Sequence, residues 1–105
     1  MAWIYLVAAG LLEIGWPVGL KMGWTETGAK PAWLGLSILC IVASGALLLW
    51  AQRTIPMGTA YAVWTGIGAV GAFTVGIVAF GDQATAMRIV SIGLIVAGIV
   101  GLKLA

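Results

Sequence analysis

The chain has 105 residues, of which 63% are hydrophobic and 8% are charged, and its formal net charge is +2. A soluble domain of this size needs a charged surface that this composition does not supply, so the lipid bilayer is the environment that fits. The five basic residues stand singly, which excludes a nucleic-acid patch, and the lack of His together with a single Cys excludes a His-containing or multi-Cys zinc site and an intrachain disulfide.

Four apolar segments follow in chain order, each near the roughly 20 residues that a helix needs to cross about 30 Å of hydrocarbon. We expect membrane-spanning helices over about 2–22, 32–52, 57–80 and 85–104. The first contains Glu13 and lacks the basic region of a signal peptide, so we interpret it as a retained span. Pro31 suits the first turn of the second helix, and Asp82 is an N-cap type of residue before the fourth. The prediction is an all-α membrane protein with a single four-helix transmembrane domain over 1–105.

The basic residues give almost no signal for orientation in the membrane. If both termini lie on one side, that side receives Arg53 and Lys103, and the other receives Lys21, Lys30 and Arg88. The positive-inside rule depends on an excess of Lys and Arg on one side of the membrane, and two residues against three is a weak excess. We therefore expect that the chain can insert in either orientation. The alternative is a topology fixed by another signal. Four helices are few for enclosing a pathway, and no internal repeat is present. We therefore expect a homodimer, which mixed insertion would make antiparallel.

Glu13 lies near the middle of the first span, where a carboxylate costs roughly 2.5–3.5 kcal/mol on insertion scales. All five basic residues lie near span ends, so none matches its depth. Acids at this depth usually face a bundle interior and serve a function, and such a group can hold a proton when its site is empty and lose it when a cation arrives. The alternative is a protonated Glu that makes a structural hydrogen bond between helices.

Aromatic residues fall into two classes. Five lie near span ends, as an interfacial belt requires: Trp3, Tyr5, Trp24, Trp33 and Trp50. Three lie deeper. Trp16 shares a helix face with Glu13 at i+3, and Tyr61 and Trp64 share a face of the third helix. An indole face attracts a cation and a phenol can orient a carboxylate, so we predict a cation box; buried packing is the alternative. Ser44, deep in the second span, either bonds Glu13 or bonds back to its own helix.

The third and fourth spans contain small residues that indicate close helix packing. Gly66 and Gly68 belong to a glycine-rich stretch of the third span, which also predicts a hinge for alternating access. Ser91 and Gly98 stand seven residues apart on one stripe of the fourth span and predict a helix-dimer contact. Cys40 stands inside an apolar run, where we expect a packing residue and not a reactive thiol.

Two motifs, AGLLEIGWPVGLK around Glu13 and PMGTAYAVWTGIGAVGA in the third span, resemble those of the small multidrug resistance family of four-helix transporters. The resemblance covers essentially the whole chain and is strongest to the guanidinium exporter subtype, on Trp16, the run 58–68 and Lys103. It implies an antiparallel, dual-topology homodimer in the bacterial inner membrane. It also implies proton antiport at two copies of Glu13. The remaining pocket residues implied by motif position are Trp16, Ser44, Tyr61 and Trp64. Pro17 departs from the subtype, which usually has a small residue there, and a proline removes a backbone donor beside the pocket.

The predicted function is export of guanidinium or small substituted guanidinium ions, such as guanylurea-like cations, in exchange for protons and without a cofactor. A planar guanidinium matches a carboxylate with two parallel N–H donors. One alternative is an exporter of quaternary ammonium and other lipophilic cations in the same family. Another is a non-transporting membrane subunit or small channel in which Glu13 is structural. An enzyme is not expected, because the chain has three acids and no His from which to assemble a nucleophile and base.

Overall fold

The computed structural model describes all 105 residues. Four long helices account for most of the chain: α1 (Ala2–Gly23), α2 (Pro31–Ala51), α3 (Met57–Phe80) and α4 (Ala86–Leu104). Their ends lie within one residue of the expected segments. Each helix is long and apolar enough to cross a membrane, which confirms the all-α, four-helix membrane class.

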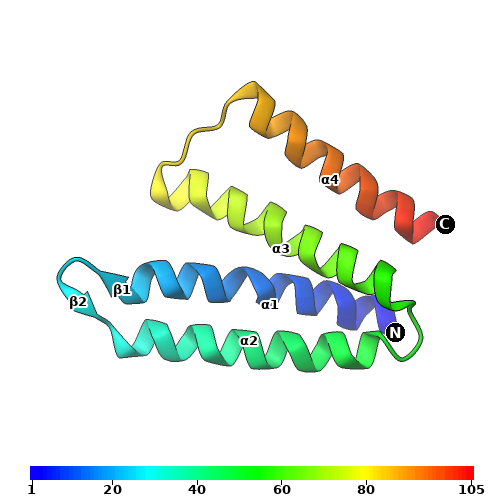
Figure 1. The fold of residues 1–105 in the computed structure, drawn as a ribbon, viewed down its shortest axis with the longest axis horizontal. Coiled ribbons are helices and arrows are strands. Elements are labelled where there is room, and N and C mark those ends of the chain that lie inside the picture. Colours follow the sequence, from blue (N-terminus) through cyan, green and yellow to red (C-terminus); the bar gives the residue numbers. More distant parts are fainter.

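The helices form a thin layer and not a closed bundle. α1 packs between α2 and α3, while α4 lies at the edge and packs mainly on α3 (Figure 1). The dimensions of the fold are 47 × 34 × 16 Å. α1 and α3 run in the same direction, and both chain termini lie at the same end of the layer (Figure 1). A layer this thin leaves most of its apolar surface facing outwards, for lipid or for another protein chain.

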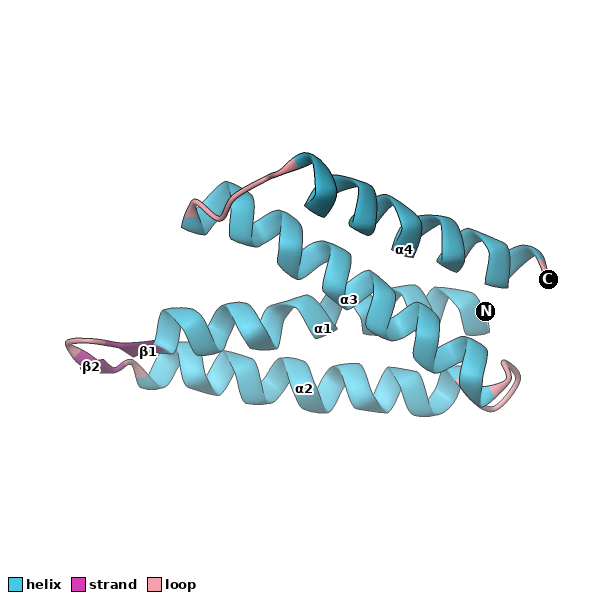
Figure 2. Ribbon diagram, turned by 45° about the horizontal axis from the view of Figure 1, so that its top comes forward, coloured by secondary structure: helices cyan, strands magenta, loops and turns pink.

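The first link contains an antiparallel hairpin that the sequence did not indicate. Strands β1 (Trp24–Thr25) and β2 (Gly28–Ala29) pair beyond the ends of α1 and α2 (Figure 2). Gly28 has a positive φ of 124°, and the Thr25 hydroxyl donates to its carbonyl at 2.8 Å. Pro31 then begins α2 in the first turn, as expected, where its missing N–H is not needed.

The third link corrects the expectation that Asp82 caps α4. The N-cap is Thr85, whose hydroxyl accepts from the backbone N–H of Arg88 at 3.3 Å. Asp82 belongs instead to the end of α3. Gly81 adopts the left-handed conformation at φ 70°, and the N–H of Asp82 donates back to the carbonyl of Gly76 at 3.0 Å.

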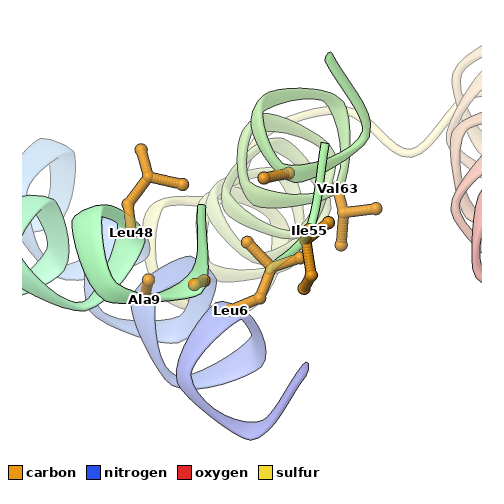
Figure 3. Close-up of a cluster of buried hydrophobic side chains, with 7 residues drawn as sticks. Leu6, Ala9, Leu48, Ile55 and Val63 are labelled. Atoms are coloured by element: carbon orange, nitrogen blue, oxygen red, sulfur yellow. The ribbon is translucent and has the colours of Figure 1, made fainter. Parts of the chain in front are cut away.

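The hydrophobic core lies between α1, α2 and the first turns of α3. It contains Leu6, Ala9, Leu48, Ala51, Ile55, Ala60 and Val63 (Figure 3). Only 16 of the 105 residues are buried, and none of them lies on α4. The buried hydrophobic cluster is therefore concentrated at one end of α1–α3.

Small residues bring α1 and α2 close together. Three α1 glycines spaced by four residues face α2, and a methyl group on any of them would collide with it: Gly15 with Cys40, Gly19 with Ser37, and Gly23 with Leu34. Such a stripe lets two backbones approach within hydrogen-bonding reach of each other's side chains. Cys40 is buried in this contact, in agreement with a packing role.

Candidate functional site

The site is centred on Glu13, which α1 carries near its midpoint. The side chain is half-buried, and its Oε1 accepts a hydrogen bond from Nε1 of Trp16 at 2.5 Å. The two residues are three apart on one helix, so they share a face, as their spacing predicts. The indole N–H therefore fixes one carboxylate oxygen and leaves the other directed towards α2.

Ser44, on α2, links α1 and α3 beside this carboxylate. Its side chain is fully buried, and its hydroxyl donates to the carbonyl of Ala9 on α1 at 2.7 Å while it accepts from Nε1 of Trp64 on α3 at 2.8 Å. Oε2 of Glu13 lies 3.5 Å from the same hydroxyl. The alternative of a bond back to its own helix is therefore wrong. A hydroxyl has one proton, so Ser44 can fully satisfy either Ala9 or Glu13, and the distances favour Ala9.

Gly68 lies directly against Glu13. A Cβ added at this glycine would stand 2.7 Å from Cγ of Glu13 and 3.2 Å from its Cβ. Gly66, two residues earlier, faces α4 instead, where a Cβ would stand 2.8 Å from Cδ1 of Ile99. Of the two glycines proposed as a hinge, Gly66 therefore contacts α4 and Gly68 contacts α1. The sequence did not predict the contact between Gly68 and Glu13.

Tyr61 is the least enclosed of the pocket candidates, with 56% of its surface exposed. Its ring centre lies 5.4 Å from that of Trp64, with the two planes inclined at 50°. The pair forms an aromatic corner at the start of α3. The phenol makes no hydrogen bond to Glu13 within one chain, so Tyr61 faces outwards beside the site.

Ser37 was missed by sequence reasoning. It is 2% exposed, and its hydroxyl donates across the helix contact to the carbonyl of Trp16 at 2.9 Å. Ser37 and Ser44 are seven residues apart on α2 and bond Trp16 and Ala9, which are seven apart on α1. The two bonds therefore hold α1 on either side of Glu13. The signal in the sequence that could have identified Ser37 is its hydroxyl, which lies two helical turns before Ser44 in the same span.

The proposed dimer residues lie on open surface. The hydroxyl of Ser91 donates to the carbonyl of Met87 on its own helix at 2.8 Å, and a Cβ at Gly98 would meet no atom within 4 Å. At the end of the same helix, the ammonium of Lys103 lies over the ring of Trp3, 4.7 Å from its centre. The stripe that carries Ser91 and Gly98 is thus free for a further contact.

Residues 1–95 match the family model described as Small Multidrug Resistance protein. The whole chain aligns with proteins named guanidinium exporter. Those of Citrobacter freundii and Salmonella typhimurium are 53% identical over 105 residues, which is 100% of this chain and 98% of each relative. The guanidinium exporter of Escherichia coli (strain K12) is 52% identical with the same coverage.

Proposed function

Because the chain belongs to the small multidrug resistance family, we propose that it exports guanidinium and small substituted guanidinium ions, guanylurea-like cations among them, in exchange for protons. The observation that carries the proposal is the carboxylate of Glu13, held by Trp16 at one oxygen and lying beside Ser44 at the other. The full-length relatives named guanidinium exporter support the choice of cargo.

The chemistry of the site suits a small planar cation. A guanidinium presents paired N–H donors that match the two oxygens of one carboxylate. The oxygen of Glu13 that faces Ser44 has only a long contact at 3.5 Å, so it retains capacity to accept. The indoles of Trp16 and Trp64 add ring faces that attract a cation. A proton and a guanidinium compete for the same oxygens, and this competition couples their movements in opposite directions.

The proposal includes an antiparallel homodimer in the bacterial inner membrane, with two copies of Glu13 lining one central site. A layer 16 Å thick does not enclose a pathway. No residue of α4 is buried, and the stripe of Ser91 and Gly98 is open to a second copy. Tyr61, exposed beside Trp64, would complete the pocket in the dimer, and the stretch of Gly66 and Gly68 would bend as access alternates. The near-even split of basic residues supports insertion in both orientations.

Uptake of labelled guanidinium into proteoliposomes tests the mechanism. A pH gradient should drive concentrative uptake by the wild-type protein, and Glu13→Gln should abolish it, because an amide neither binds a proton nor carries a charge. Glu26→Gln, which removes an acid from the exposed hairpin, is the matched control and should transport normally. Gradient-driven uptake by Glu13→Gln would refute the mechanism. Flux that ignores the pH gradient in the wild-type protein would instead indicate a channel.

Equilibrium binding supplies an independent test. Guanidinium binding to the wild-type protein should weaken as the pH falls, because protons then occupy the oxygens that the cation needs. Guanidinium should also displace tetraalkylammonium ions, whose nitrogen has no N–H donor for the carboxylate. Stronger binding of tetraalkylammonium would favour the quaternary ammonium alternative. Labelling of the termini from both membrane faces tests dual topology, and labelling from one face only would exclude the antiparallel dimer.

A further inference from the structure

A small cavity of about 100 Å³ lies between α1 and α3, near the membrane surface where the third link begins. The residues of its wall that matter here are Pro17, Lys21, Ala72, Gly76, Phe80 and Asp82. It combines an acid, a base and an aromatic ring in a part of the molecule that the Glu13 site does not use.

The cavity and Glu13 lie along the same contact between α1 and α3. α1 and α3 run in the same direction (Figure 1), so equal steps along both helices stay at matching levels. Steps of four residues lead from Glu13 and Gly68 to Pro17 and Ala72, and then to Lys21 and Gly76. Each step rises about 6 Å at 1.5 Å per residue. The inner end of the cavity is therefore about one helical turn from Glu13.

The backbone places the carboxylate of Asp82 at the outer end of this cavity. The left-handed turn at Gly81 directs the chain back, and the N–H of Asp82 bonds the carbonyl of Gly76 at 3.0 Å. The carboxylate lies over Gly76, where any Cβ would collide with it. No Lys or Arg nitrogen lies within 4.0 Å of the Asp82 carboxylate, so Asp82 forms no ion pair. The ammonium of Lys21 lies instead over the ring of Phe80, 4.7 Å from its centre.

We propose that this cavity is an entry site at which the exported cation pauses on its way between water and Glu13. This inference rests on the proposed function. Asp82 attracts the cation and Phe80 offers it a ring face. The ammonium of Lys21 already lies on that face of Phe80 and competes with the incoming cation, which keeps the binding weak. Weak binding is what a transit site requires, because a cation that enters must also leave.

Initial rates of guanidinium uptake at subsaturating concentration test the entry site. Asp82→Asn should lower kcat/KM by roughly twofold to fivefold at about 150 mM salt, where charges act over only about 8 Å and a charge outside the cavity contributes little. The maximal rate should not change, because Glu13 is intact. Lys21→Gln should raise kcat/KM under the same conditions, since it removes the competing cation.

Two controls separate a local effect from a general one. Glu26→Gln removes the same charge from the hairpin on the same side of the membrane, outside the cavity, and should leave kcat/KM unchanged at about 150 mM salt. Asp82→Glu keeps the charge and should retain the rate. Equal rates for Asp82→Asn and Glu26→Gln at about 150 mM salt would overturn the entry site. Absence of guanidinium uptake by the wild-type protein would overturn the proposed function instead.

Discussion

The contact between Gly68 and Glu13 leads to a quantitative prediction for Gly68→Ala. The new Cβ would stand 2.7 Å from Cγ of Glu13 and 3.2 Å from its Cβ, whereas carbon atoms pack at about 3.5–4.0 Å. Both atoms belong to the stem of the side chain and not to its flexible end. Glu13 must therefore move by about 1 Å, enough to lengthen its bond to Trp16 beyond the 2.5 Å observed.

In enzymes, a displacement of about 1 Å at a positioned group can lower the rate by about 100-fold. We expect Gly68→Ala to lower kcat/KM for proton-driven guanidinium uptake by about that factor, although alanine is the better helix former. Uptake into proteoliposomes, normalised to the amount of inserted protein, measures the effect. Gly35→Ala is the matched control, because its new Cβ meets nothing within 4 Å. Activity of Gly68→Ala within twofold of the control would refute the argument that Glu13 depends on this contact.

Two further predictions concern the hydrogen bonds around the acid. Trp16→Phe keeps a ring but removes the indole donor, and guanidinium binding measured by calorimetry should weaken about tenfold, as expected for a bond to a charged group; an unchanged Kd would contradict this role. Ser44→Ala deprives the Trp64 indole of its acceptor and should destabilise the protein by about 1–3 kcal/mol, seen as a lower thermal unfolding midpoint in detergent. A midpoint equal to that of the wild-type protein would show that the indole finds another partner.

The helices could be predicted from the sequence because the bilayer imposes a length that each apolar run meets. The pairing of Glu13 with Trp16 could also be predicted, since a spacing of three residues fixes neighbours on one helix. Contacts between helices could not. That Gly68 touches Glu13 depends on the rotation of α3 against α1, which no local pattern specifies.

The sequence could not identify the nearest partners of Ser44 and Asp82, for a related physical reason. Ser44 was expected either at Glu13 or on its own helix; it does lie 3.5 Å from Oε2 of Glu13, but the close approach of α1 and α2 also offers it the carbonyl of Ala9, its nearer acceptor at 2.7 Å. Asp82 has the chemistry of a cap for α4, but the turn at Gly81 assigns it to α3. In both cases a side chain had several acceptable partners, and the distance between backbones decided among them.

The single proton of Ser44 has a consequence for the site as a whole. The acceptors gathered there are both oxygens of Glu13, the carbonyl of Ala9 and the Ser44 oxygen, while the donors are the indoles of Trp16 and Trp64 and the Ser44 hydroxyl. Because the short bond of the Ser44 hydroxyl goes to Ala9, Oε2 of Glu13 keeps only the contact of 3.5 Å and can accept a further hydrogen. Under the proposed mechanism, that hydrogen is either a proton on Glu13 or an N–H of a guanidinium. The proposal thus makes proton and cargo alternative partners of the same oxygen, and a cation without N–H groups would replace neither.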